Sequence, residues 1–173
     1  MIDFITTLLA RTEPRISEAT VGDAGDMAAL HAASFHRGWS EDEFERLLLD
    51  RLVVAHRVTI SRRLVGFVIS RVISGEAEIL SVAIAAARRR KGLARRMLDL
   101  HLRRLAGLGA RSVFLEVNEG NLAANRLYRR AGFHPVGRRE GYYPKLSERR
   151  RAGDFPGQVD HSTAALVLRC ELP

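Results

Sequence analysis

The run Arg88-Arg89-Arg90-Lys91-Gly92-Leu93-Ala94 constrains the fold more than any other stretch, because it joins two patterns of different period. Before it, Ile79 to Ile84 is a β-branched run typical of a strand, and from Leu93 the apolar residues recur at helical spacing. A strand that turns into a helix presents backbone N–H groups with no intrahelical partner, and the helix dipole adds partial positive charge there. Gly92 and Ala94 are small enough for a phosphate to approach the backbone. The junction predicts a pyrophosphate site, and the alternative is a solvated basic loop that caps the helix.

The rest of the chain switches repeatedly between strand and helix periodicity. Asp23 is placed to cap a helix, and Ser40 with Glu43 forms a capping box before a second one. Strands are expected at 15–19, 52–60, 64–73, 77–85, 111–117, 134–139 and 163–172, and helices at 24–35, from 40, at 93–107 and at 122–131. This order, β-α-α-β-β-β-α-β-α-β-β, predicts an α/β protein built on a mixed (α+β) sheet.

The length of the chain suits a single domain over residues 1–173, with a leader over 1–13 and a long polar loop over 147–161. No apolar run approaches the roughly 20 residues that cross a bilayer. The start, Met1 to Leu9, lacks the early positive charge of a secretory signal. We therefore expect a cytoplasmic protein without a membrane partner.

Cysteine and histidine usage argues against a metal or disulfide protein. The single cysteine, Cys170, excludes an internal disulfide, and its alternating strand pattern is more typical of a buried residue than of a nucleophile. The six histidines have no ligand-like spacing. We expect no metal.

The net charge of +8 and the pI near 10.8 predict a polyanionic partner, which could be a nucleotide cofactor, RNA or the ribosome surface. Lys91 and Lys145 are the only lysines, so nearly all of the positive charge is arginine. Such a bias can record genome composition, and aromatic residues that would stack on bases are sparse. Specific recognition of a nucleic acid is therefore not expected.

Two further residues, Glu116 and Tyr128, can each be interpreted either as catalytic or as purely structural. Glu116 ends the apolar run Val113–Leu115, where an acid either points to solvent or serves as a base. Tyr128 follows twelve residues later within a predicted helix, where a tyrosine either packs or donates a proton. The two residues taken alone leave both readings open.

Together these motifs resemble a known family. Arg89-x-x-Gly92-x-Ala94 at a strand-to-helix junction resembles the acyl-CoA pyrophosphate loop of the GNAT N-acetyltransferase superfamily. The block from Glu116 to Phe133 matches the pattern E-V-x-x-x-N-x-x-A-x-x-L-Y-x-x-x-G-F of the RimI-like ribosomal-protein alanine N-acetyltransferases. Two more matches to that family are Trp39-Ser40-Glu41 and Gly141-Tyr142-Tyr143-Pro144. The resemblance covers about Arg15 to Pro144 with the last strand, and it implies the GNAT fold.

The resemblance implies an acetyl-CoA-dependent N-acetyltransferase in which Glu116 is the general base and Tyr128 the general acid. The chemistry is consistent with these roles. A peptide α-amino group has a pKa of about 7.7–8.0 and must lose a proton before it attacks a thioester, which a carboxylate can assist through water. A tyrosine hydroxyl can protonate the departing thiolate. Because no acyl-enzyme is required, we expect direct transfer in a ternary complex.

Binding residues follow from the same resemblance. Backbone groups of Val82 and Ile84 would hold the pantetheine arm, with Asn121 close to it, although Asn121 could simply cap the next helix. The pyrophosphate loop would use Arg89, Arg90, Lys91, Gly92, Leu93, Ala94 and Arg95. The acceptor groove would be lined by Trp39, Asn118, Tyr142 and Tyr143.

The sequence departs from the family in three places. Ala85-Ala86-Ala87 stands where Asp-Pro is common, Asn118 stands where an arginine is common, and the segment Glu148–His161 looks longer than usual. These departures bear on the acceptor more than on the cofactor. We expect a protein N-terminal amine as the acceptor, that of a ribosomal protein, and a contact with the ribosome surface. A GNAT enzyme for a small amine is the second hypothesis, and a noncatalytic ribosome- or RNA-binding module is the third.

Overall fold

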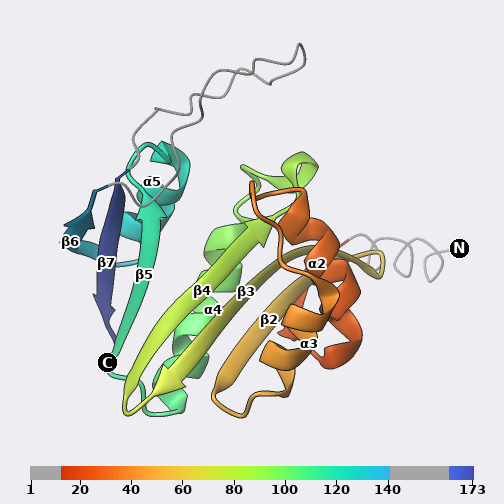
Figure 1. The fold of residues 1–173 in the computed structure, drawn as a ribbon, viewed down its shortest axis with the longest axis horizontal. Coiled ribbons are helices and arrows are strands. Elements are labelled where there is room, and N and C mark those ends of the chain that lie inside the picture. Colours follow the sequence, from red (N-terminus) through yellow and green to blue (C-terminus); the bar gives the residue numbers. More distant parts are fainter. Residues whose placement is uncertain (1–12, 141–163) are drawn as a thin grey trace, which may run out of the picture.

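The computed structural model describes residues 13–140 and 164–173, and they form one seven-stranded sheet flanked by helices (Figure 1). The elements are β1 (Arg15–Glu18), η1 (Val21–Asp23), α2 (Ala24–Ala32), α3 (Glu41–Leu49), β2 (Val53–Ile60), β3 (Arg63–Ile73), β4 (Glu76–Ile84), η2 (Ala86–Arg88), α4 (Leu93–Gly107), β5 (Ser112–Asn118), α5 (Leu122–Arg130), β6 (His134–Arg139) and β7 (Ala165–Glu171). The predicted order of strands and helices is confirmed.

Two details of the first helix differ from the prediction. The helix α2 ends at Ala32 rather than at residue 35, because the chain turns back there: a Cβ at Gly38 would lie 2.9 Å from the Cα of Ala32. Asp23 occupies the N-cap position of α2, but its side chain makes no capping hydrogen bond to that helix. It accepts a hydrogen bond from the backbone N–H of Thr20 at 2.8 Å and forms an ion pair with Arg57 of β2. By contrast, the capping box of Ser40 and Glu43 is confirmed.

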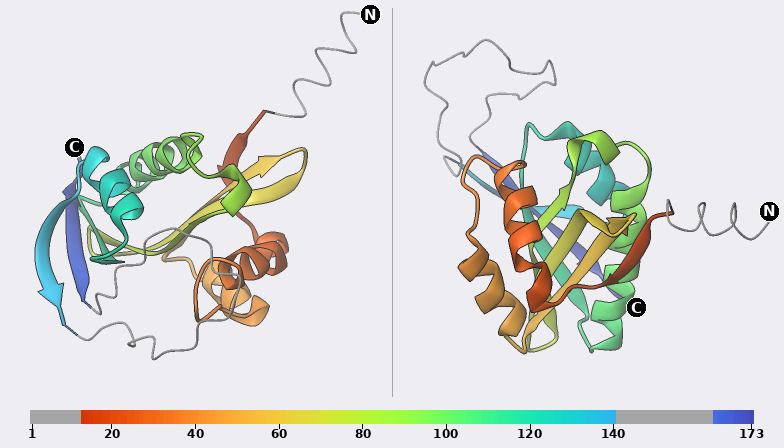
Figure 2. Two further views of the ribbon diagram at one scale, coloured as in Figure 1. Left: turned by 90° about the horizontal axis from the view of Figure 1, so that it is seen from above. Right: turned by 90° about the vertical axis from the view of Figure 1, so that its right-hand side faces the viewer.

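The sheet has the strand order β1-β2-β3-β4-β5-β7-β6. Neighbouring strands pair antiparallel, except that β4 and β5 run parallel. Helices α2 and α3 cover one face of the sheet, and α4 and α5 lie on the other (Figure 2, left). The parallel pair at the centre therefore joins the half β1-β2-β3-β4 to the half β5-β7-β6.

Each face of the sheet has its own apolar core. On the α4 and α5 face, the fully buried side chains include Val58, Val68, Met97, Leu98, Leu105 and Val113. On the α2 and α3 face, they include Met27, Phe44, Phe67 and Ile69. Cys170 is buried in the first of these cores, as its strand pattern predicts, and burial raises the pKa of its thiol. Within residues 13–140 and 164–173, no helix is long and apolar enough to span a membrane.

Candidate active site

The parallel strands β4 and β5 pair only along their first halves. Glu76 to Ile79 are in register with Ser112 to Leu115, after which β4 continues to Ile84 and β5 to Asn118 without pairing to each other. Figure 1 shows the two strands separating beyond this point. We call it the β4/β5 fork. A bulge in the β3–β4 ladder, between Ile69 and Ser70, lies at the same level and places the extra residue Leu80 in β4.

Beyond the fork, one edge of β4 carries backbone groups that no strand pairs. The N–H of Ala85 donates to the Val65 carbonyl at 2.8 Å. Antiparallel ladders alternate, so Ser81 and Ala83 direct their backbone hydrogen bonds to β3, and Val82 and Ile84 direct theirs towards β5. These two residues are the ones that the sequence assigned to the pantetheine arm, whose amides need such an edge. The Ser81 hydroxyl is buried without a partner among the described residues.

The predicted pyrophosphate loop forms the entrance to α4. Gly92 is the N-cap residue with φ +75°, and Arg90 before it also has a positive φ of +61°. Nothing lies within 4 Å of where a Cβ on Gly92 would be, so the space in front of the helix N-terminus is open. The first N–H groups of a helix are donors without intrahelical partners, which suits a pyrophosphate. This geometry and the free edge of β4 both fit acetyl-CoA.

The side chains of this loop differ in their exposure and in their hydrogen bonds. Arg90 and Lys91 are exposed. Arg89 donates from Nε to the carbonyl of Ile84 at 2.9 Å, which ties the loop back to the end of β4. Arg95 donates from Nε to Asp99 Oδ1 at 2.7 Å, and its Nη1 donates to the Arg130 carbonyl at the end of α5. Arg95 therefore bridges α4 and α5, a role that sequence reasoning did not foresee.

Glu116 lies beyond the fork on the face that carries α2 and α3. Its neighbours Leu115 and Val117 are buried in the α4 and α5 core, so the alternation of the strand turns Glu116 to the other side. The side chain is 19% exposed, and its Oε1 lies 2.9 Å from Nη1 of Arg139. Arg139 is on β6, which β7 separates from β5. This ion pair was not predicted, because β6 and β5 are two strands apart.

Tyr128 lies on the opposite face from Glu116. It is buried in the α4 and α5 core, where its ring packs against Phe133 at 5.7 Å in an edge-to-face arrangement. The structure thus places the two predicted catalytic residues on different sides of the sheet, next to the strand that borders the fork.

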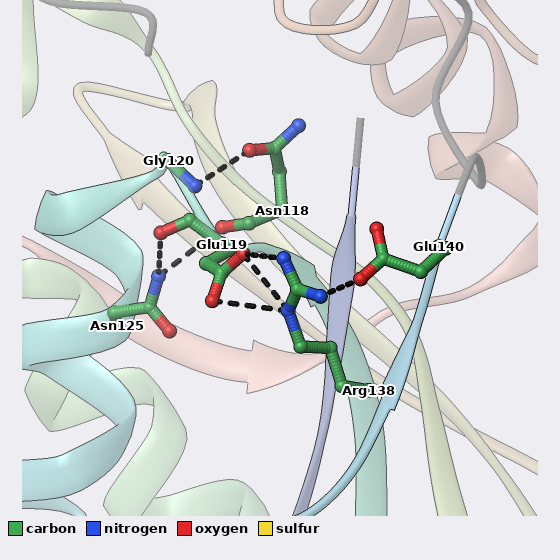
Figure 3. Close-up of polar contacts among 6 residues, drawn as sticks. All are labelled: Asn118, Glu119, Gly120, Asn125, Arg138 and Glu140. Carbon is green, nitrogen blue, oxygen red and sulfur yellow. Dashed lines mark hydrogen bonds and ion pairs between the residues drawn. The ribbon is translucent and has the colours of Figure 1, made fainter. Parts of the chain in front are cut away.

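The turn between β5 and α5 is held by three asparagines, of which Figure 3 shows Asn118 and Asn125. The side chain of Asn118 accepts a hydrogen bond from the Gly120 N–H at 2.8 Å, and that of Asn121 caps α5 by accepting from the Ala124 N–H at 3.1 Å. Buried Asn125 donates from Nδ2 to the carbonyls of Asn118, Glu119 and Asn121 at 3.0–3.1 Å. Asn125 holds this turn in a way that sequence reasoning missed, although an asparagine in the middle of an amphipathic helix is a usable signal.

Arg138 connects this turn to β6. It donates to Glu119 from Nε and Nη2, the latter at 2.8 Å, and it also pairs with Glu140 (Figure 3). These hydrogen bonds hold the pKa of Arg138 above its usual value. Arg138 and Arg139 are neighbours on one strand, so their side chains point to opposite faces. Arg138 holds the turn on one face, and Arg139 reaches Glu116 on the other.

Trp39 lies between α2 and α3, in a cluster of aromatic rings around buried His31. The His31 ring stacks on Phe35 at 4.3 Å and on Trp39 at 4.7 Å, and its Nδ1 accepts a hydrogen bond from the Trp39 N–H at 3.0 Å. Phe44 and Phe67 complete the cluster, because each ring contacts His31 and the two rings contact each other. Burial lowers the pKa of His31, although Glu43 opposes this, so the ring is neutral and able to accept.

A second buried histidine anchors α4. His101 bonds through Nδ1 to Nδ1 of His56 on β2 at 2.8 Å, and through Nε2 to the Ser70 hydroxyl on β3 at 2.7 Å. Burial, reinforced by His56, lowers the pKa of His101 to about 3. This network ties the helix behind the pyrophosphate loop to the sheet. The sequence showed only scattered histidines here.

Tyr142 and Tyr143, predicted to line the acceptor groove, lie outside the described residues, as does the segment Glu148–His161. The other predicted site residues fall into two groups. Those predicted for the cofactor lie between Val82 and Arg95 and at Asn121, and those predicted for the acceptor are Trp39, in the α2–α3 connection, and Asn118, at the end of β5. Among residues 13–140 and 164–173, no group of three or more His, Cys, Asp or Glu side chains could hold a metal ion.

Comparison with known proteins gives consistent matches. The sequence model of the acetyltransferase (GNAT) family matches residues 24–133. A ribosomal protein bS18-alanine N-acetyltransferase of Escherichia coli K12 is 31% identical over 114 residues, which are 66% of this chain and 76% of the relative. The enzyme of the same name from Salmonella typhimurium is 32% identical over 106 residues, 61% of this chain and 71% of the relative.

Solved structures share the fold. The crystal structure of the ribosomal-protein-S18-alanine N-acetyltransferase from Escherichia coli has a TM-score of 0.78 at 23% identity, covering 92% of this chain and 94% of that one. Arabidopsis thaliana NAA60 in complex with a bisubstrate analogue has a TM-score of 0.76 at 18% identity, covering 92% and 98%. At these identities the structural likeness concerns the fold.

Proposed function

This chain belongs to the acetyltransferase (GNAT) family and is an N-acetyltransferase that uses acetyl-CoA, and we propose that its acceptor is the N-terminal α-amine of a protein, a ribosomal protein in particular. The observation that carries this proposal is the likeness to bS18-alanine N-acetyltransferases at 31% identity over three quarters of their length. The acidic first turn of α3, which follows Trp39 closely in the chain, supports it. Helix α3 begins with Glu41, Asp42 and Glu43, and such a surface attracts a basic peptide.

On the cofactor side, backbone groups supply most of the binding. The N-terminus of α4, with Gly92 as its N-cap, would take the pyrophosphate, and the exposed Arg90 and Lys91 would add charge. The edge of β4 that no strand pairs, at Val82 and the N–H of Ile84, would hold the amides of the pantetheine arm, while the Ile84 carbonyl accepts from Arg89. Acetyl-CoA supplies the activated thioester carbonyl.

On the acceptor side, Glu116 would assist removal of the proton from the α-ammonium, directly or through water, so that the neutral amine attacks the thioester. Tyr128, on the opposite face of the sheet, would give a proton or a hydrogen bond to the departing thiolate. The two groups would act on different atoms of one reaction, the base on the acceptor amine and the acid on the thiolate. Transfer is direct, within a ternary complex, and needs no nucleophile on the enzyme.

The acceptor class is tested by steady-state kinetics with acetyl-CoA and a panel of amines. The panel holds peptides with varied N-terminal residues, the same peptides with blocked N-termini, and small amines, namely a polyamine, an aminoglycoside and free amino acids. We expect the highest kcat/KM with a free peptide N-terminus and none with the blocked peptides. A clear preference for the small amines would overturn the proposal, leaving the family assignment in place.

A further inference from the structure

The two helical layers of the protein carry opposite charges. Helices α4 and α5 hold seven arginines and one aspartate, whereas α2 and α3 hold five carboxylates and one arginine. The layers lie on opposite faces of the sheet (Figure 2). A genome-wide bias towards arginine would replace lysine by arginine at every basic position of the chain. It would not place acidic residues on one face of the sheet and basic residues on the other.

The arginines of α4 and α5 lie on the solvent-facing sides of two helices on the same face of the sheet, and we call them together the basic layer. Arg95 and Arg104 are partly neutralised by Asp99 and Glu18. The other five are exposed and have no ion pair with any carboxylate of the described residues: Arg96, Arg103, Arg126, Arg129 and Arg130. Helix α4 is about 22 Å long at about 1.5 Å per residue, so the charges extend well beyond the pyrophosphate loop.

We propose that the basic layer binds the phosphate backbone of double-stranded RNA, without reading its sequence. Guanidinium groups match phosphate geometry through paired N–H donors, and neutralising phosphates releases counterions, which supplies sequence-independent affinity. The affinity for a phosphate backbone goes beyond the proposed acceptor and does not depend on it, whereas the choice of RNA over DNA rests on that proposed function.

Two observations favour a duplex backbone over single-stranded nucleic acid and over a membrane surface. Neither α4 nor α5 exposes an aromatic ring, since Tyr128 is buried, so the layer has no platform on which unpaired bases would stack. The apolar residues of α4 are committed to the core, among them Leu98, Leu102 and Leu105. The helix therefore has no second apolar face to insert into a membrane surface. A duplex backbone presents phosphates at regular spacing and needs only charge.

The basic layer is distinct from the cofactor site. Arg103 lies two turns along α4 from Arg95, and Arg126 is in the middle of α5, so neither belongs to the loop that would hold the pyrophosphate. RNA and acetyl-CoA should therefore bind together. For an enzyme whose acceptor is a ribosomal protein, such a surface would raise the local concentration of enzyme near ribosomal particles.

The test is fluorescence anisotropy with a labelled RNA duplex of about 16 base pairs, titrated between about 50 and 200 mM KCl. The double variant R103E/R126E should weaken binding by at least about tenfold and reduce the slope of log K against log salt by about 2. The matched control is R51E/R62E. It changes the net charge equally at exposed arginines outside the layer, and its affinity should stay within about twofold of wild type. If charge reversal disturbs folding, the neutralising variant R103Q/R126Q is used in its place, and it should also bind the RNA more weakly than R51E/R62E.

Three results would overturn the inference: no binding of wild type at about 50 mM KCl, equal losses in both double variants, or competition between RNA and saturating acetyl-CoA. Stronger binding to phosphatidylserine vesicles than to RNA would equally reject it. Acetylation of a free N-terminal peptide is measured alongside and should be unchanged in R103E/R126E. Loss of RNA binding with intact acetylation therefore separates this inference from the proposed function.

Discussion

The cofactor side and the acceptor side of the fork are built in different ways. On the cofactor side, the edge of β4, the loop and the first turn of α4 are a continuous stretch from Val82 to Arg95, and many of the groups proposed to bind the cofactor are main-chain groups. On the acceptor side, Glu116, Arg139 and Trp39 come from three separate parts of the chain. A site made of backbone is held by local geometry, whereas a site made of distant side chains depends on packing.

Each side nevertheless has a buried histidine as its anchor. His101 joins α4 to β2 and β3 through His56 and Ser70, and His31 joins the α2–α3 connection to the core through Trp39. Both rings accept or share hydrogen bonds in the neutral form, and burial lowers the pKa of each. The two sides should therefore differ in their response to side-chain substitution and share a sensitivity to acid.

The largest expected effect is a loss of kcat, with little change in acetyl-CoA affinity, when the proposed catalytic residues are substituted. Glu116→Gln should lower kcat by about 100-fold or more, because it removes the base while keeping the shape of the side chain. Tyr128→Phe should also lower kcat. The affinity for acetyl-CoA, measured by calorimetry, should change little in either variant, and Glu78→Gln on the exposed part of β4 is the control. Full activity in both variants would remove these residues from the mechanism.

The next effect is a loss of stability in acid that both histidine anchors share. The pKa of His101 is about 3 in the folded protein against about 6.5 when unfolded. Between these values the unfolded chain binds a proton that the folded one does not, so stability is full above about pH 6.5 and falls as the pH drops. From pH 6.5 to 5 the loss is about 2 kcal/mol from this group. His56 and His31, whose pKa values are also lowered, add to it.

Denaturant unfolding at a series of pH values between 7 and 5 measures this loss. His101→Gln should flatten the dependence, whereas His36→Gln, at an exposed histidine, should leave it as in wild type. A stability that is constant over this range would contradict the assigned role of the buried ring.

A smaller effect is expected from charge reversal in the pyrophosphate loop. Arg90→Glu should raise the KM for acetyl-CoA by about tenfold and leave kcat at saturation near wild type, since the backbone donors at the α4 N-terminus remain. Arg62→Glu is a closely matched control, because Arg62 is another exposed arginine with a positive φ, +68° against +61°. An unchanged KM in Arg90→Glu would show that the side-chain charge of the loop contributes nothing to cofactor binding.

The smallest effect concerns the ion pair at Glu116. A cationic acceptor and the Arg139 guanidinium compete for the same carboxylate, so Arg139→Gln should lower the KM for the acceptor by up to about fivefold, the usual worth of a partly exposed pair. Arg138→Gln is the control, because its side chain leaves β6 on the other face and pairs with Glu119. A fall in acetyl-CoA affinity in Arg139→Gln would contradict the assignment of Arg139 to the acceptor side alone.

Most of the cofactor side could be predicted from the sequence. The switch of period at Arg88–Ala94 located the strand end, the loop and the helix N-terminus, because each depends on residues within about one turn of its neighbours. The capping box at Ser40 was predictable for the same reason. Sequence reasoning was wrong about the end of α2, where Gly38 approaches from further along the chain. It placed Asp23 correctly at the N-cap of α2 but could not show that its carboxylate pairs with Arg57 and Thr20 and makes no hydrogen bond to that helix.

By itself, the sequence determined the order of strands and helices, the form of the pyrophosphate loop, and the positions of Glu116 and Tyr128 along the chain. Only the tertiary structure decided that these two residues lie on opposite faces beyond the fork, that Arg139 reaches Glu116, and that His31 holds Trp39. The reason is physical. Periodicity and capping are local properties of a chain, whereas contacts between β5 and β6, or between His101 and His56, exist only after the register of the whole sheet is set.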